Sequence, residues 1–167
     1  MHPGAGGSII RLEIIDERNR ADVLRIDRSD ISEDWVDSIS DILDLHQYGL
    51  DHSCIGHTYA VYADDTCIGV VLMGEGIPWP CDPAEVAGIP FYRIMGFVID
   101  RAWRCKGLGG QVLEMVISRI FDEFGPRPIL IGVQQDNVRA AAFYQRYGFC
   151  PTNAWDEDDH FFIRYPQ

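Results

Sequence analysis

The chain has very little positive charge. Its 167 residues include a single lysine, Lys106, and its 14 Lys and Arg residues compare with 26 Asp and Glu residues, so the formal net charge is −12. Nucleic-acid backbones are bound mainly through basic side chains that displace counterions, and anionic membrane surfaces attract basic segments. The charge therefore argues against nucleic acid and against a membrane as partners.

Cysteine motifs and long apolar stretches are also missing. The five cysteines are scattered and include no C-x-x-C pair, so they indicate neither a disulfide framework nor a zinc ribbon. The neighbouring His46, His52, Cys54 and His57 fit no zinc spacing, and we expect no metal. No apolar run approaches the ~20 residues of a transmembrane helix. The N-terminus shows no signal-peptide pattern, and we expect a cytoplasmic protein.

The composition, with 47% hydrophobic and 24% charged residues, is typical of a globular protein of one domain. We expect a flexible leader over residues 1–8 and a single domain over residues 9–167. Hydrophobic periodicity predicts a strand, two short helices of which the second is capped by Ser32, three antiparallel strands, a helix, a strand, a helix and a final hairpin. This order predicts a mixed α/β fold.

A glycine-rich turn follows the strand predicted at residues 92–100, and it consists of Arg104, Cys105, Lys106, Gly107, Leu108, Gly109 and Gly110. A helix N-terminus directs backbone N–H groups at an anion, and glycines let a phosphate approach closely. Arg104 and Lys106 add positive charge. The turn is not a Walker A loop, because no hydroxyl follows the lysine and glycine, and Val112 breaks the dinucleotide fingerprint. The remaining R-x-x-G-x-G spacing suits a pyrophosphate, and an ordinary glycine turn is the alternative.

A second motif lies at residues 137–149, which read N-V-R-A-A-A-F-Y-Q-R-Y-G-F. It closely resembles the N-x-x-A-x-x-x-Y-x-x-x-G-F signature of the GCN5-related N-acetyltransferase (GNAT) superfamily, and R-x-x-G-x-G resembles that superfamily's acetyl-CoA loop. The resemblance covers about residues 92–150. Residues 95–100, M-G-F-V-I-D, look most like bacterial diamine, spermidine and spermine acetyltransferases.

This resemblance implies a mixed, mostly antiparallel twisted sheet with helices on both faces and acetyl-CoA at a splay between the two central strands. Backbone groups of Phe97, Val98 and Ile99 would pair with the pantetheine arm as an added strand does. The amides from Arg104 to Gly110 would hold the pyrophosphate, and the Asn137 side chain would bond the pantetheine arm. Tyr144 would be the general acid that protonates the departing thiolate. Without the motif, Tyr144 would be read as a core aromatic.

The base that deprotonates the amine has no clear candidate. Members of the superfamily often carry a glutamate early in the strand before the pyrophosphate loop, where this chain has Arg93. The nearest replacement is Glu75, at the end of the preceding strand, and Asp82 and Glu85 are further candidates. The implied enzyme is an N-acetyltransferase whose catalytic residues would be Tyr144 and Glu75.

The charge is distributed unevenly along the chain. Residues 1–91 carry 17 acidic and 5 basic side chains, whereas residues 92–150 carry 5 acidic and 8 basic ones. A cationic small amine, such as a polyamine, would suit a cleft lined by the acids between residues 27 and 37. Aminoglycoside-like and peptide amines are alternatives, and so is a non-catalytic acyl-CoA-binding or sensing domain. A homodimer is compatible with this reading.

Overall fold

A seven-stranded sheet in the order β1-β2-β3-β4-β5-β7-β6 runs through residues 7–167, the part of the chain that the computed structural model describes. The strands are β1 (Ile10–Ile14), β2 (Gly56–Ala63), β3 (Thr66–Glu75), β4 (Tyr92–Ile99), β5 (Ile129–Gln134), β6 (Cys150–Asp156) and β7 (Asp159–Arg164). The helices are α1 (Arg20–Leu24), α2 (Ile39–Asp51), α3 (Leu108–Phe124) and α4 (Val138–Arg146), with 3-10 turns η1 (Ala84–Val86) and η2 (Arg101–Trp103). The predicted order of elements is confirmed.

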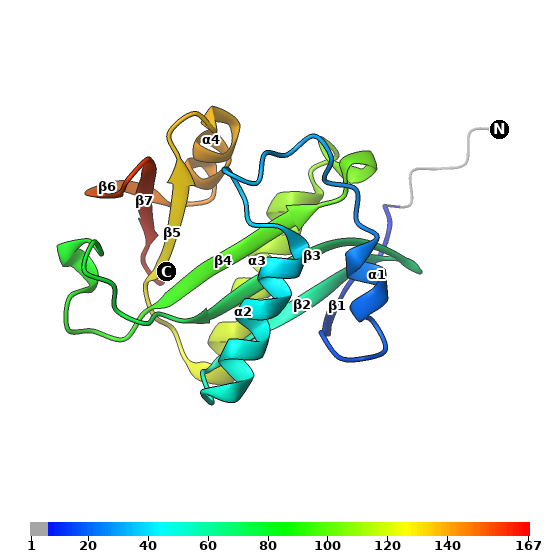
Figure 1. The fold of residues 1–167 in the computed structure, drawn as a ribbon, viewed down its shortest axis with the longest axis horizontal. Coiled ribbons are helices and arrows are strands. Elements are labelled where there is room, and N and C mark those ends of the chain that lie inside the picture. The colour runs from blue at the N-terminus through cyan, green and yellow to red at the C-terminus, as the bar shows by residue number, and fades with distance from the viewer. Residues whose placement is uncertain (1–6) are drawn as a thin grey trace.

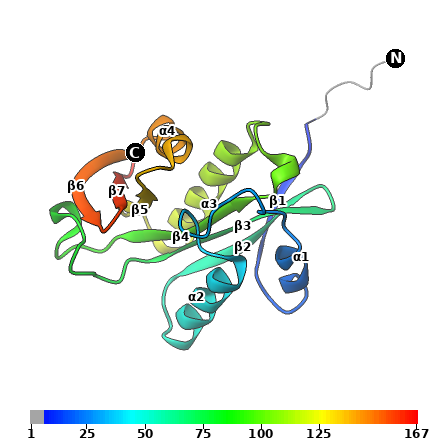
Figure 2. The same ribbon diagram turned by 45° about the horizontal axis from the view of Figure 1, so that its top comes forward.

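Helices cover both faces of the sheet (Figure 1; Figure 2). The α3 face holds a core of side chains from α3 and β1–β5, and α2 contributes to a second core on the opposite face. Every strand pair is antiparallel except β4 with β5. The predicted fold, a mixed and mostly antiparallel sheet with helices on both faces, is therefore confirmed.

The predicted start of the second of the two short helices is wrong. Ser32 only closes a turn, in which its hydroxyl accepts a hydrogen bond from the Asp34 amide at 3.2 Å. The N-cap of α2 is Ser38, whose hydroxyl accepts from the Asp41 amide at 3.1 Å. The first buried residue of α2 is Ile39. The polar residues Glu33, Asp34 and Asp37 before it line the cavity at the opening between β4 and β5 and do not pack on the sheet.

The pairing of β4 with β5 is the shortest in the sheet. It consists of Tyr92 opposite Ile129 and Arg93 opposite Leu130, and beyond Arg93 the strands diverge (Figure 1). Both strands keep their outer partners, since β4 pairs with β3 and β5 pairs with β7 along most of their lengths. A register shift in the β3–β4 ladder next to Met95 bends β4 at the start of this opening. The predicted splay between the two central strands is present.

Three further findings concern the sequence predictions. The expected leader, residues 1–8, falls mostly outside the described residues, and residues 7 and 8 have no regular structure. Within residues 7–167, no helix has the length and apolar character needed to cross a membrane. Nor do three His, Cys, Asp or Glu side chains of this part of the chain gather in a way that could hold a metal ion.

Gly96 lets α2 approach β4 directly beside the opening. A Cβ at this position would lie 2.6 Å from Cδ1 and 2.7 Å from Cγ1 of Ile42, a side chain that is fully buried. The absence of a side chain at residue 96 therefore sets how closely α2 lies over the divergence of β4 and β5.

We expect Gly96→Ala to lower the free energy of unfolding by about 1–3 kcal/mol, because overpacking a filled core forces neighbours out of place. Gly49→Ala in α2 is the matched control, since its Cβ would meet only Cys54 at 3.9 Å and alanine favours a helix by roughly 0.5–1 kcal/mol. Thermal and urea unfolding followed by circular dichroism measure both variants. Equal stability of Gly96→Ala and the wild type would contradict this prediction. It would mean that the Ile42 side chain can move aside without lowering the free energy of unfolding.

Candidate active site

A cavity of about 790 Å³ fills the space where β4 and β5 diverge. The beginning of α3, the helix α4, the segment between α1 and α2 and the beginning of β7 surround it. The predicted site residues that line it are Phe97, Ile99, Arg104, Cys105, Gly107, Gly109, Gly110, Asn137 and Tyr144. Val98, Lys106 and Leu108 do not line it, and Glu75 lines a different cavity.

The exposed edge of β4 forms one wall. Phe97 packs toward the α3 face and Val98 toward the α2 face, as alternation along a strand requires. On one side the backbone of residues 97–99 pairs with β3, while the ladder to β5 has already ended at Arg93. This edge offers the backbone groups with which an extended ligand arm can pair as an additional strand.

The glycine turn opens α3 with the geometry of an anion site. Cys105 and Gly107 have φ values of 60° and 75°, and Gly107 is the N-cap of the 17-residue helix without any side-chain cap. The first amides of α3 therefore have no side-chain acceptor, and the positive end of the helix dipole adds to their attraction for an anion. A pyrophosphate fits this arrangement.

Two glycines of the turn are also required by side-chain packing, which the sequence motif does not reveal. A Cβ on Gly110 would lie 1.8 Å from the hydroxyl oxygen of Tyr147, and one on Gly109 would lie 3.4 Å from Phe143. Both aromatic rings belong to the α4 region. Gly109 and Gly110 therefore allow the beginning of α3 to pack against α4, whereas Gly107 has open space around its Cβ position and is needed for its positive φ.

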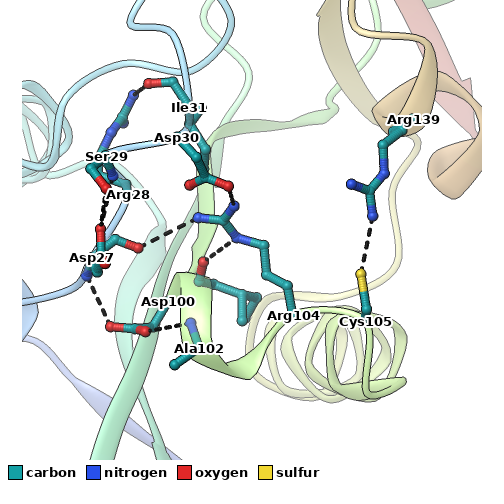
Figure 3. A network of polar contacts seen from close by, with 11 residues as sticks. Asp27, Arg28, Ser29, Asp30, Ile31, Asp100, Ala102, Arg104, Cys105 and Arg139 are labelled. Atoms are coloured by element: carbon teal, nitrogen blue, oxygen red, sulfur yellow. Dashed lines mark hydrogen bonds and ion pairs between the residues drawn. The ribbon is translucent and has the colours of Figure 1, made fainter.

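The Arg104 side chain is engaged within the protein (Figure 3). Its Nε donates to the carbonyl oxygen of Ile99 at 2.8 Å, and its guanidinium forms an ion pair with Asp30. The hydrogen bond from Arg104 lowers the pKa of the Asp30 carboxyl. The Asp27 amide donates to Asp100 Oδ2 at 2.9 Å in the same network. The Arg104 side chain thus connects the segment after α1 with the glycine turn. Because the side chain has these partners, its backbone amide is the group that can still bind a phosphate as predicted.

The sequence reasoning missed a nearby cation, Arg139 on α4. Its Nη2 donates to Cys105 Sγ at 3.1 Å, so it lies beside the glycine turn and lines the cavity (Figure 3). Lys106, in contrast, places its Nζ 5.2 Å from the centroid of the Trp103 ring. Arg139 is the third residue of the motif at residues 137–149, a position that the signature leaves open and that therefore carries no signal for a phosphate-binding role.

Tyr144 is buried on α4 and lines the cavity. The rings of Phe143, Phe149 and Phe97 surround it at centroid distances of 5.1, 5.4 and 6.5 Å. Burial raises the pKa of its phenol above the usual value, so the group is protonated at neutral pH. Its hydroxyl has no hydrogen-bond partner among residues 7–167, and it is available to donate a proton into the cavity.

Asn137 caps α4, and its side-chain Oδ1 accepts from the Ala140 amide at 3.3 Å. This bond orients the side chain at the cavity wall and leaves the amide nitrogen as a donor. Asn137, as the N-cap, and Tyr144 belong to one short helix, which begins a few residues after the end of β5.

Glu75 is not brought together with Tyr144. It is exposed at the end of β3, opposite Tyr92 in the ladder as expected, and it lines a second, mostly apolar cavity of about 350 Å³ on the α2 face. The two cavities share Trp79, Arg93 and Met95 at their boundary. Asp82, another candidate base, is occupied in an ion pair with Arg93 at 2.8 Å.

Carboxylates from two distant segments instead face the cavity that contains Tyr144. They are Asp30, Glu33, Asp34 and Asp37 before α2, and Asp156 and Asp159 of the β6–β7 hairpin. Burial raises the pKa of Asp159, and the nearby Asp156, Asp158, Asp37 and Glu157 raise it further. The pKa of Asp37 is also raised, by burial and then by Asp41, against the opposing effect of Arg28. Asp27, which the sequence grouped with these acids, does not line the cavity.

Comparison with known proteins bears on the family. The family described as "Acetyltransferase (GNAT) family" matches residues 20–149. A probable spermine N(1)-acetyltransferase of Bacillus subtilis subsp. natto is 32% identical over 53 residues, which are 32% of this chain and 35% of that protein. The matched segment thus spans about a third of the length of this curated relative.

Two solved structures share the fold. A GNAT family acetyltransferase from Elizabethkingia anophelis with acetyl-CoA bound has a TM-score of 0.61 at 16% identity, over 94% of this chain and 98% of that one. The PaiA N-acetyltransferase from Thermoplasma acidophilum in complex with coenzyme A has a TM-score of 0.67 at 12% identity, over 95% and 99%. The family match covers most of the sequence, including both motifs and the opening between the central strands, and the chain belongs to the acetyltransferase (GNAT) family.

Proposed function

We propose that the protein transfers the acetyl group of acetyl-CoA to a small, cationic amine by direct attack in a ternary complex. The observation that carries this proposal is the single cavity at the divergence of β4 and β5. An anion-binding helix terminus and a protonated tyrosine lie on one part of its wall, and a group of carboxylates lies on another. The family assignment supports the same activity.

On the donor side, the amides at the beginning of α3 bind the pyrophosphate, with Arg139 supplying a nearby charge. The edge of β4 at Phe97–Ile99 pairs with the pantetheine arm, and Asn137 donates a hydrogen bond to it. Acetyl-CoA, when bound, supplies the activated thioester carbonyl. Tyr144 then donates its proton to the departing sulfur, because its phenol is protonated and lines the cavity in which the thiolate forms.

On the acceptor side, the amine must lose a proton before or during attack. The geometry favours Asp37 and Asp159 over Glu75 as the groups that accept it, because both line the cavity that contains Tyr144. Their raised pKa brings these carboxyls closer to the range in which a general base is effective. The surrounding negative charge also attracts a cationic amine.

Polyamines are one candidate within this class. The negative charge of the cavity wall and the limited similarity to a probable spermine acetyltransferase support them. The second candidate function is a non-catalytic acyl-CoA-binding or sensing domain, which the absence of any carboxylate on residues 91–99 favours. Homodimer formation remains a prediction from the sequence.

A thiol-release assay with acetyl-CoA tests the proposal against polyamines, aminoglycosides, amino acids and peptides. We expect turnover with at least one cationic amine and saturation in both substrates. Tight CoA binding measured by calorimetry, combined with no thiol release across the whole panel, would contradict the proposed acetyltransferase activity. It would support the acyl-CoA-binding or sensing domain instead. Release from acetyl-CoA without any amine, measured in parallel, gives the hydrolysis background.

We expect Tyr144→Phe to lower kcat by about 100-fold or more, the usual scale for the loss of a general acid, while the Kd for CoA stays close to the wild-type value. Tyr165→Phe is the matched control, because Tyr165 is exposed near the end of the chain and does not line the cavity. Thiol release at saturating substrate measures kcat. Wild-type turnover in Tyr144→Phe would remove this residue from the chemistry.

Asp159→Asn should act in opposite directions on stability and activity. A carboxyl whose folded-state pKa is raised contributes stability that is fully present below its unfolded pKa and lost as pH rises through its folded pKa. At pH 7 the charged Asp159 therefore opposes folding, and we expect the asparagine variant to melt at a higher temperature than the wild type. The difference should shrink at pH 3, where the wild-type carboxyl is protonated.

We expect the same variant to lose about 10-fold or more in kcat/KM for a cationic amine at pH 7, because a carboxylate facing the amine is removed. Asp65→Asn, in the exposed turn between β2 and β3, serves as the control for both measurements. A lower melting temperature at pH 7 together with unchanged kcat/KM would contradict the role assigned to Asp159.

A further inference from the structure

Arg93 contains an unused hydrogen-bond donor inside the protein. Its Nη1 is shielded from solvent and has no hydrogen-bond partner within residues 7–167. The side chain as a whole is 4% exposed. Burying a donor without a hydrogen-bond partner lowers the free energy of unfolding by about 1–3 kcal/mol, because the donor loses its hydrogen bond to water. Native structures contain few such groups.

The rest of the guanidinium is held firmly. Its Nη2 donates to both carboxylate oxygens of Asp82, at 2.8 and 3.0 Å, and to the carbonyl oxygen of Ile77 at 3.0 Å. The Trp79 ring stacks on it at 3.8 Å, and the Phe91 ring lies 5.2 Å from it. These contacts fix the plane of the guanidinium, so Nη1 is preoriented and has no freedom to seek a partner elsewhere.

The position of Arg93 connects this donor with the proposed acceptor site. Arg93 is the last β4 residue that pairs with β5, and it lines both cavities where they meet. Its guanidinium lies 5.9 Å from the Phe161 ring on β7. Asp159 precedes Phe161 by two residues on the same strand, so it projects from the same face about 7 Å further along.

The positively charged hydrogen-bond donor of Arg93 and the carboxylate of Asp159 thus lie at neighbouring positions of one cavity wall. A ligand that satisfies both carries an ammonium group for the acids and an oxygen for Arg93, a few bonds apart. A polyamine contains no oxygen, and its protonated nitrogens have no lone pair with which to accept a hydrogen bond from Nη1. An α-amino group beside a carbonyl or carboxylate meets both requirements.

We propose that Arg93 Nη1 donates a hydrogen bond to an oxygen of the acceptor, and that the acceptor is an amine adjacent to a carbonyl or carboxylate, as in an amino acid or a peptide N-terminus. This inference rests on the proposed acetyltransferase activity and narrows its substrate. Trp79 is 38% exposed and is the most exposed of the three rings around the guanidinium. Because Nη1 is shielded from solvent, the oxygen reaches it only when one of these rings moves aside, and Trp79 is the least enclosed of them.

The test compares acceptors that share one carbon chain and differ in the oxygen-bearing group, with kcat/KM expressed per neutral amine because a carboxamide lowers the pKa of the amino group beside it. Lysinamide and cadaverine share one diamine chain, and only lysinamide carries a carboxamide beside an amine. We expect kcat/KM from thiol release to be at least 10-fold higher for lysinamide, with acetylation of its α-amino group identified by mass spectrometry. Free lysine and a lysyl peptide, assayed in parallel, distinguish an amino acid from a peptide as the source of the oxygen.

Arg93→Lys examines the residue itself. The ammonium group of lysine cannot bond Asp82 and also present a second fixed donor, so the ratio of kcat/KM values for lysinamide and cadaverine should fall toward one. Arg11→Lys is the matched control. Arg11 also pairs with a carboxylate, Glu13 at 3.0 Å, and lies over an aromatic ring, Tyr62 at 4.7 Å, but it is on β1 and outside both cavities. The Arg11 variant should keep the wild-type ratio.

The outcomes separate the two proposals. Equal or higher kcat/KM for cadaverine or spermidine with the wild-type protein overturns the inference and leaves the acetyltransferase standing. An unchanged substrate ratio in a folded Arg93→Lys variant overturns the role of Arg93. If that variant does not fold, the wild-type ratio alone still decides the substrate class. No release with any amine overturns the acetyltransferase activity, and this inference with it.

Discussion

The short ladder between β4 and β5 is the constraint on which the rest of the site depends. Two residue pairs hold the strands together, and each strand then follows its outer neighbour. The divergence exposes one backbone edge of β4. It also places the beginnings of α3 and α4 around the gap, because α3 is the next α-helix after β4 and α4 is the next after β5 (Figure 2). Backbone donors, helix dipoles and the motif side chains therefore converge on one cavity without any long-range loop.

The same opening divides the electrostatics of the molecule. The glycine turn and Arg139 give its donor end a positive character, while the segment before α2 and the β6–β7 hairpin line it with carboxylates. Arg104 lies at the boundary, and its ion pair with Asp30 holds the acidic segment against the glycine turn. The uneven charge of the sequence thus corresponds to two regions of one cavity, and an internal ion pair keeps them adjacent.

The parts of the site that could be predicted from sequence are those whose residues lie close together along the chain. A glycine turn before a helix and the Asn137-to-Phe149 motif each form one local structure, so their spacing carries the information. The local pattern at Ser32 matches a helix cap, but the burial that decides where α2 begins comes from the sheet beneath it. Glu75 lies opposite the beginning of β4, as its place at the end of the preceding strand predicts, but that strand end faces another cavity.

The sequence by itself determined the order of elements, the glycine turn and the helix that carries Asn137 and Tyr144, because hydrophobic periodicity and short motifs act within a few residues. Only the tertiary structure decided the partners across the sheet. It brought Asp37 and Asp159 to one cavity, gave Gly110 its role beneath Tyr147, and enclosed Arg93 among aromatic rings with one donor unpaired. Contacts of this kind join residues far apart in the chain, and no local pattern records which strands meet or where two of them separate.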